Sequence, residues 1–336
     1  MLQTTEKEPI RKHTTDAETF AKRGRADFFS TNFKVALANA NNKSPFREKY
    51  LKSIICSREL KAENGKITGI YCNQRWCITC NRIRTAKLIN KYLREIKSME
   101  DPYFFTLTLK NCKGEELKDR IKFMTKTWGI IQKKFYKKKN TKGFRKLEIT
   151  YNSKFNDYHP HFHGIIEGKH NAEIVIEKWI KAISAAGIEI DEKWQDMKPA
   201  TPGSEKELMK YTTVLTPKRK KGQLWEDLLQ KDGAVRKHLQ SQDTIYIAME
   251  RVRTFQYFGF TQNEEEQTQE ELEEEKLEVK SQETQLIIPE GTYIRDGRGN
   301  WTHTLLDVKL HNRPINERLI KLVNLLGGNY IRPIKI

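Results

Sequence analysis

The alternation of apolar and polar residues predicts several strands in the middle of the chain. Residues 103–109, Tyr-Phe-Phe-Thr-Leu-Thr-Leu, alternate with a period of two and end at a polar turn, 111–114. Residues 146–151 and 161–167 alternate in the same way, and the polar loop between them suits a β-hairpin. A fourth strand is expected around 188–194.

Helical patterns separate these strands. Residues 115–138 and 172–186 carry apolar residues at helical spacing, and Gly187 ends the second pattern. After the break at 199–203, Ser204 can cap a third helix in which Glu207 takes the capping-box position. The resulting β-α-β-β-α-β-α order predicts an α+β fold with an antiparallel central sheet and helices on one face.

Composition divides the chain into five expected regions. They are a mostly loose, flexible N-terminal arm with one short helix at most (1–45), a four-cysteine zinc module (46–95), the α+β domain (96–262), an acidic disordered linker (263–285) and a small C-terminal accessory domain (286–336). The linker is rich in Glu and Gln and has too few apolar residues to form a core. The last region contains one amphipathic helix near 316–326.

The charge of the chain favours a polyanionic partner over a merely soluble basic protein. The formal net charge is +18. The acidic stretch 264–283 holds roughly −8 of charge, so the rest of the chain holds roughly +26. Lys and Arg that neutralise phosphates release counterions, which makes nucleic acid the expected partner. No apolar run approaches the roughly 18 residues of a membrane span, and the N-terminus is not signal-like, so we expect a cytoplasmic protein without a membrane partner.

Four of the five cysteines have the spacing of a metal site. Cys72, Cys77 and Cys80 bring three thiolates onto one turn, and Cys56 is within reach through a hairpin at Gly65. Four thiolates at about 2.3 Å satisfy tetrahedral Zn²⁺ and leave no open position, so the zinc would be structural. The alternative is a group of four reduced, buried cysteines.

Basic and aromatic residues around this cluster leave two interpretations open. Arg75, Trp76, Arg82 and Arg84 could contact phosphate and a base, or they could be ordinary surface and core residues. Two basic runs, 133–139 and 218–221, could likewise hold a DNA strand or be solvated helix ends and loops.

The sequence His161-Phe162-His163 places two imidazoles on one face of a strand. A hairpin turn centred near residues 155 and 156 would pair Glu148 with His163, which adds a carboxylate to the two imidazoles. This ligand set leaves open positions at which Mg²⁺ or Mn²⁺ can bind a phosphate oxygen. Taken alone, the two histidines could also be ordinary surface residues.

The same alternation separates a polar face from a core face. Thr106, Thr108 and Thr150 should share the polar face with Glu148, His161 and His163. The residues expected on the core face are Phe105, Leu107, Leu109, Leu147, Ile149, Phe162 and Ile166. His159 is a further imidazole, which could be a ligand but which we interpret as a loop residue beside Pro160.

Tyr211 and Glu207 are candidates for chemistry on the third helix. They are four residues apart, so their side chains share a helix face. A metal that withdraws charge from a phosphate makes attack by a phenol feasible, and Glu207 could then activate a later hydroxyl or water. The alternative is a packing tyrosine and a capping glutamate.

Three ordered stretches resemble motifs of the rolling-circle replication initiators, the single-tyrosine plasmid Rep proteins of the HUH endonuclease superfamily. Residues 104–109 resemble their first motif, 147–152 with 158–163 the metal motif, and 207–211 the tyrosine motif. The resemblance covers roughly residues 50–260. It departs from the family in lacking a lysine shortly after the tyrosine, since the next one is Lys218 beyond Pro217.

The resemblance implies an HUH/RRM-like palm and a DNA nicking and strand-transfer enzyme. His161 and His163, with Glu148, would bind the divalent ion. Tyr211 would form a 5′-phosphotyrosine and free a 3′-hydroxyl primer, and Glu207 would assist termination. The implied partners are single-stranded or hairpin origin DNA, a host helicase and a host DNA polymerase.

Two other functions fit parts of the pattern. A mobilisation relaxase or a single-tyrosine transposase would use the same chemistry. A noncatalytic zinc-containing DNA-binding regulator would bind without cleavage and without dependence on Mg²⁺ or Mn²⁺.

Overall fold

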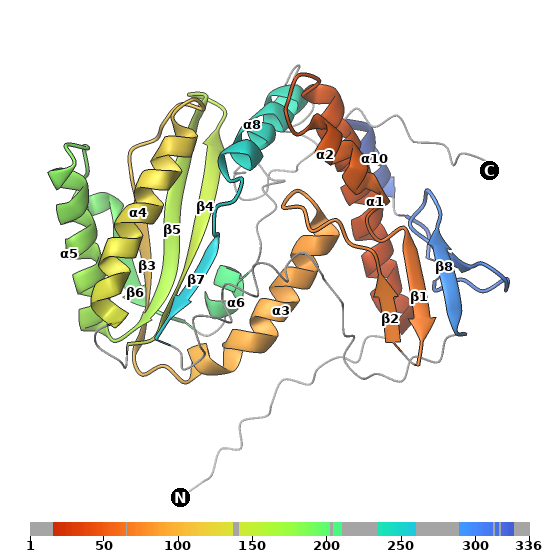
Figure 1. The fold of residues 1–336 in the computed structure, drawn as a ribbon, viewed down its shortest axis with the longest axis horizontal. Helices are drawn as coiled ribbons and strands as arrows, with labels where there is room; N and C mark the ends of the chain where they lie inside the picture. Colours follow the sequence, from red (N-terminus) through yellow and green to blue (C-terminus); the bar gives the residue numbers. More distant parts are fainter. Residues whose placement is uncertain are drawn as a thin grey trace, which may run out of the picture.

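Two antiparallel sheets organise the computed structural model of the chain (Figure 1). The structure describes residues 16–64, 66–136, 141–201, 204–209, 234–259, 289–311, 313–315 and 317–325. One sheet has five strands and the other has four. The fold is therefore α+β, as the sequence predicts.

The five-stranded sheet is built around a long hairpin. From one edge to the other its strands are β6 (Asp196–Pro199), β3 (Pro102–Thr108), β5 (Asp157–Glu167), β4 (Gly143–Asn152) and β7 (Phe255–Phe258). The expected fourth strand at 188–194 is displaced: residues 192–194 form a short 3-10 helix, and β6 begins after it. β5 is the central strand and pairs with both β3 and β4.

Helices cover both faces of this sheet, which corrects the expectation of helices on one face. The core face, with all seven residues predicted for it buried, packs against α4 (Leu117–Tyr136) and α5 (Lys169–Ala185). On the opposite face α3 (Ile78–Lys97) and α6 (Ser204–Met209) cover one end of the strands. Apolar residues such as Phe144 and Ile165 lie at that end, so only part of this face is polar.

The N-terminal region is an ordered helix from residue 16 onward, so the expectation of a loose arm is wrong for 16–45. α1 (Asp16–Ala40) buries Phe33 and Leu37 against Trp76 and residues of α8 (Ala234–Ala248). Its partners come from several sides and from distant parts of the chain. Its apolar residues therefore do not form the single stripe that reveals a surface helix in a sequence.

The four-stranded sheet joins the cysteine module to the C-terminal segment. Its strands are β1 (Glu59–Glu63), β2 (Lys66–Gly69), β8 (Gly291–Arg295) and β9 (Trp301–His303). β1 pairs with β2 as the expected hairpin, and its other edge pairs with β8. The strands of segment 286–336 thus continue the sheet of the cysteine module. The amphipathic helix expected there is α10 (Glu317–Leu325).

Two helices connect the halves of the molecule (Figure 1). α8 contributes Ile245 to the core of the five-stranded sheet and Tyr246 to the core around α1. α3 starts within the cysteine cluster and ends on the five-stranded sheet, where Tyr92 and Ile96 are buried. The remaining elements, α2 (Arg47–Lys52) and the 3-10 turn Ser53–Ile55, follow α1. Within the described ranges, no helix has both the length and the apolar character that a membrane crossing requires.

Candidate metal centres

Glu148, His161 and His163 meet on the polar face of the β4–β5 hairpin. Glu148 pairs directly with His161, and Lys146 is the residue opposite His163. The predicted pairing of Glu148 with His163 is therefore wrong by two residues, because the hairpin turns through residues 153–156, one residue earlier than expected. A shift of two residues keeps every side chain on its face, so the same three ligands still converge.

Their donor atoms are close enough to share one ion. Oε2 of Glu148 lies 3.4 Å from Nε2 of His163 and 3.7 Å from Nε2 of His161. Ligands about 2.1 Å from a common ion are about 3.0–3.4 Å apart at octahedral and tetrahedral angles. Only a small closing movement is needed. Three protein ligands would leave positions for a substrate oxygen, so the residues present fit a divalent ion.

Hydrogen bonds hold both imidazoles with Nε2 toward the carboxylate. Nδ1 of His163 lies 3.0 Å from the Thr106 hydroxyl, and Nδ1 of His161 lies 3.0 Å from the carbonyl of His159. A carbonyl can only accept, so His161 carries its proton on Nδ1 and keeps the Nε2 lone pair for an ion. Such second contacts orient metal ligands.

The environment of the cluster keeps His163 neutral near pH 7. Burial, with the neighbouring His161, lowers the pKa of His163 to about 4, although Glu148 acts in the opposite direction. A neutral imidazole needs no proton release before it binds a metal. Lys146 lies beside the cluster, with its ammonium 3.6 Å from Oε1 of Glu148 and its side chain buried. We did not predict Lys146, although its spacing of two residues from Glu148 on a strand places both on one face.

The four cysteines form a second, closed cluster. The sulfur atoms of Cys56, Cys72, Cys77 and Cys80 all lie within 4.8 Å of one another. The separations are 3.6 Å for Cys56–Cys80 and Cys56–Cys77 and 3.7 Å for Cys72–Cys80. Four sulfurs at about 2.3 Å from a tetrahedral Zn²⁺ are about 3.8 Å apart. The four cysteines therefore fit zinc, as the spacing predicts.

Hydrogen bonds surround the sulfurs of this cluster and favour a thiolate at Cys77. The Ser30 hydroxyl donates to Sγ of Cys77, and the backbone N–H of Cys72 donates to Sγ of Cys56. Hydrogen bonds from the other three cysteines lower the pKa of Cys77 well below its usual value. Burial lowers the pKa of Lys34, but the surrounding thiolates outweigh this and hold it above its ordinary value. No sequence pattern indicated Lys34, because it comes from α1.

Three of the four basic and aromatic residues near the cysteines make contacts within the protein, as expected of structural residues. Trp76 is buried in a core with Phe46 and Tyr50. Arg84 is buried and donates to Asn81 and to the carbonyl of Asn73. Arg75 donates to Oγ1 of Thr254 at 2.6 Å and to the carbonyl of Val252, which links the cysteine cluster to the start of β7. Among these four, only Arg82 is exposed.

The candidates on the third helix are only partly described. Glu207 is in α6, and Tyr211 lies outside the described residues. α6 itself lies on the same sheet face as the histidines, since Leu208 and Met209 are buried with Ile165 of β5. The basic run 218–221 and residues 137–139 also fall outside the described part, whereas Lys133 is exposed on α4.

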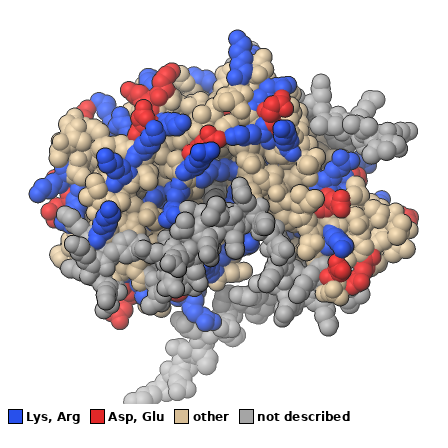
Figure 2. Space-filling model, viewed as in Figure 1, with Lys and Arg blue, Asp and Glu red and all other residues tan. Residues whose placement is uncertain are grey.

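Positive charge is plentiful on the visible surface. Figure 2 shows lysine and arginine side chains predominating over acidic ones across the half that carries the five-stranded sheet and toward the centre of the face. Such a surface attracts phosphate groups.

Comparison with known proteins gives this arrangement a class. Residues 66–171 match the model of the Rep_1 family, described as "Replication protein". The match includes Cys72, Cys77 and Cys80 of the cysteine cluster together with Glu148, His161 and His163, and it ends before Glu207 and Tyr211. The resemblance to Rep replication proteins is thereby confirmed for residues 66–171, which are similar to that family.

Several individual relatives are named "Protein rep". The chain is 33% identical over 141 residues to a "Protein rep" of Bacillus sp, a stretch covering 38% of this chain and 45% of the relative. It is 36% identical over 102 residues to one of Staphylococcus aureus (28% and 44%) and 30% identical over 117 residues to one of Streptococcus pneumoniae serotype 2 (32% and 36%). The matches thus span less than half the length of these relatives. No solved structure matches the chain.

Proposed function

We propose that this protein initiates rolling-circle plasmid replication by nicking and rejoining one DNA strand through a covalent tyrosine intermediate. The observation that carries the proposal is the open cluster of Glu148, His161 and His163 on one sheet face. The similarity of residues 66–171 to replication proteins and the surplus of basic residues in the chain support DNA as the substrate. Metal-assisted chemistry on a phosphate is what such a ligand set suits.

The proposed reaction exchanges one phosphate ester for another. Mg²⁺ or Mn²⁺ held by the three ligands would polarise a nonbridging oxygen of the scissile phosphate. The Tyr211 phenol oxygen bonds to phosphorus while the bond from phosphorus to the 3′ oxygen breaks. The phenol proton is lost, and the departing 3′ oxygen takes up a proton to become a hydroxyl. That hydroxyl would prime a host DNA polymerase working with a host helicase.

The later step would use Glu207. With the strand attached to Tyr211, a second hydroxyl or water attacks the phosphotyrosine, and Glu207 accepts the proton of the attacking oxygen. The support is positional. α6 carries Glu207 and packs on the sheet face that carries the histidines, and Tyr211 follows Met209 by two residues in the sequence. Zinc held by the four cysteines would supply rigidity rather than chemistry.

A covalent-adduct assay tests this proposal. The full chain is mixed with origin single strands of its own replicon and Mn²⁺ or Mg²⁺, and products are separated under denaturing conditions. We expect a DNA–protein adduct from wild type, none from Tyr211→Phe, and an undiminished one from the control Tyr103→Phe. His163→Ala, which lacks one ligand of the divalent ion, should form no adduct with either Mn²⁺ or Mg²⁺.

Two outcomes contradict the proposal. One is an adduct that persists in Tyr211→Phe. The other is strong DNA binding by wild type with no adduct in any divalent ion, which would favour the noncatalytic zinc-containing DNA-binding protein.

A further inference from the structure

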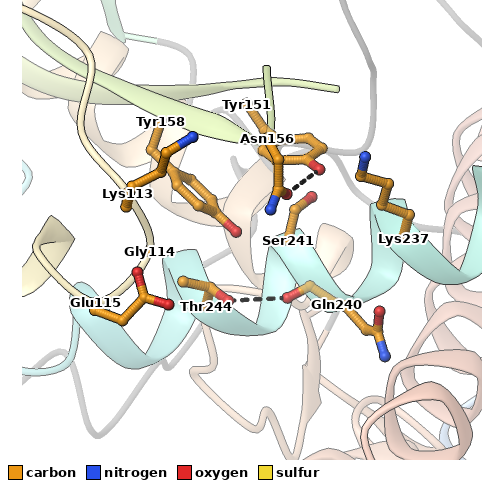
Figure 3. A pocket seen from close by; sticks show the side chains of 10 residues that line it. All are labelled: Lys113, Gly114, Glu115, Tyr151, Asn156, Tyr158, Lys237, Gln240, Ser241 and Thr244. Carbon is orange, nitrogen blue, oxygen red and sulfur yellow. Dashed lines mark hydrogen bonds between the residues drawn. The ribbon is translucent and has the colours of Figure 1, made fainter. Parts of the chain in front are cut away.

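A pocket of about 310 Å³ opens at the tip of the β4–β5 hairpin (Figure 3). Tyr151, Asn156 and Tyr158 of the hairpin form one wall. Lys237, Gln240, Ser241 and Thr244 of α8 form the opposite wall, and Lys113, Gly114 and Glu115 close one end. The volume is at the lower limit of small-molecule pockets, which are about 300–1,000 Å³, so it suits one small polar group.

The lining combines aromatic rings with positive charge. The rings of Tyr151 and Tyr158 lie 5.1 Å apart between centroids, and the Tyr151 hydroxyl donates to Oδ1 of Asn156. This bond leaves the amide nitrogen of Asn156 as a donor. Aromatic rings beside amide and hydroxyl groups are the surfaces on which nucleobases stack and form hydrogen bonds.

Two lysines reach across the mouth of the pocket to the hairpin tip. Nζ of Lys113 donates to the carbonyl of Phe155 at 2.9 Å, and Nζ of Lys237 donates to the carbonyl of Ser153 at 3.1 Å. An ammonium has three donors, so each lysine keeps capacity for a phosphate. The single carboxylate at the rim, Glu115, is an acceptor suited to the exocyclic amine of a base.

The hairpin tip adds an exposed aromatic residue beside the pocket. Phe155 is 57% exposed although it is a large apolar side chain. The ammonium of Lys154 lies 5.0 Å from its ring centroid. An exposed aromatic ring with a cation over it, next to a polar pocket with two lysines, extends the same chemistry along the surface.

One strand connects this pocket to the candidate metal centre. Tyr158 enters the pocket from one face of β5, and His161, three residues later, lies on the opposite face. At about 3.3 Å per strand residue their Cα atoms are about 10 Å apart. The loop before α4 passes around the strand edge: Cys112 pairs with Tyr158, and the Asn111 side chain accepts from His159 and donates to Asp157.

We propose that this pocket binds one unpaired nucleobase of the single-stranded DNA that continues to the Glu148–His161–His163 cluster on the other face of the hairpin. The proposal rests on the proposed function, since it takes the DNA strand as the ligand. Tyr151 stacks on the base, while Lys113 and Lys237 bind the phosphates on either side of it. The pocket therefore selects sequence a few nucleotides from the nick, and Glu115 favours a base that carries an amino group.

The test measures DNA binding apart from cleavage. All proteins carry Tyr211→Phe, and fluorescence anisotropy follows binding of labelled single-stranded 12-mers of dA, dC and dT. A random 24-nucleotide pool is also selected on each protein and sequenced. Tyr151→Leu should weaken binding about five- to hundredfold and erase the base preference at one position of the pool. Tyr151→Phe, which keeps the ring, should bind as the parent does.

The lysines are tested against a matched control. Lys237→Met should weaken binding of all sequences and lower the slope of log affinity against log salt by about one. Lys181→Met removes an equal charge from the exposed face of α5 and should change neither quantity. Deoxynucleoside 5′-monophosphates form a second arm, and we expect no binding at concentrations that saturate with the 12-mers.

Each contrary result has a separate meaning. Wild-type affinity and base preference in Tyr151→Leu would overturn the pocket proposal, as would monophosphates that bind as tightly as the strands. The adduct assay remains independent, because it uses Tyr211 and the cluster. A normal adduct with an unaffected Tyr151→Leu rejects only the pocket. An absent adduct with a weakened Tyr151→Leu rejects only the nicking chemistry.

Discussion

The two metal-ligand clusters differ in how completely the protein surrounds them. In the cysteine cluster, four sulfurs fill a tetrahedron and three of the four residues are buried. In the histidine cluster, three donors converge, and the side chains of His163 and Glu148 are 26% and 20% exposed. A filled shell excludes substrate, whereas three ligands on a partly exposed face leave room for one.

The two clusters also differ in how many structural elements supply their residues. The cysteine residues come from the 3-10 turn before β1, the loop after β2 and the start of α3, and α1 adds Ser30 and Lys34. The histidine ligands all come from one hairpin. A cluster that ties several elements together stabilises tertiary structure, while a cluster built on one rigid hairpin can lose its ion and keep its shape. The difference predicts opposite responses to mutation.

Removal of a cysteine ligand should give the largest effect. Cys77→Ala removes one of the four ligands that zinc would take and leaves three thiols, two of them buried, so we expect bound zinc to be lost and the free energy of unfolding to fall by roughly 5 kcal/mol or more. Zinc content by elemental analysis and denaturant unfolding measure this. Cys112→Ala is the control, because Cys112 is also buried but lies outside the cluster. If Cys77→Ala or zinc-free wild type is as stable as zinc-loaded wild type, the contrast between the two clusters is removed.

Acid should affect the histidine cluster through His163. Its folded pKa of about 4 lies below the unfolded value of about 6.5, so the unfolded chain binds the proton first as pH falls. The stability that neutral His163 contributes is thus complete above about pH 6.5. It is lost as pH falls toward 4, by an amount on the order of 3 kcal/mol.

Denaturant unfolding across this pH range, without added Mg²⁺ or Mn²⁺, checks this prediction. His163→Asn should lose less stability than wild type between pH 6.5 and 4. His170→Asn should follow wild type, because the His170 side chain is 78% exposed. Acid also affects the cysteine cluster, but equally in all three proteins. If the free energy of unfolding falls equally with pH in wild type and His163→Asn, burial does not lower the pKa of His163 as stated.

Local patterns predicted the sheet because one face of it is buried. The alternation at 103–109, 146–151 and 161–167 arises from that face, and the observed strands include these residues to within one or two positions. What a local pattern does not contain is pairing between distant segments. β1 pairs with β8, more than two hundred residues later, and α1 is held by Trp76 and Tyr246. Neither could be read from periodicity.

The site could be predicted as a set of residues more readily than as a geometry. Glu148, His161 and His163 were found because a register error of two residues preserves the face. The error itself came from the turn, in which Asn156 takes a positive φ of 49° that the sequence does not announce. The spacing of Lys146 and Glu148 places both on one face, but the burial of the ammonium depends on the strands that pair on either side of β4.

The smallest effect should come from Thr106, which orients the histidine cluster without joining it. Its hydroxyl is 3.0 Å from Nδ1 of His163, and it lies opposite that residue on β3. Thr106→Val keeps the shape of the side chain but removes the oxygen, so His163 loses the contact that fixes its ring. Outer contacts of this kind are worth about 10–100-fold in metal affinity or activity.

A neighbouring threonine provides the matched control for this measurement. Thr108 lies opposite His161, but its hydroxyl bonds to the carbonyl of Trp194 rather than to an imidazole. The Mn²⁺ concentration for half-maximal adduct formation should rise about 10–100-fold in Thr106→Val and remain unchanged in Thr108→Val. Zinc content should stay at the wild-type level in both, because neither touches a cysteine. An equal rise of this Mn²⁺ concentration in Thr106→Val and Thr108→Val would contradict the prediction. It would mean that the Thr106 hydroxyl has no specific part in orienting His163.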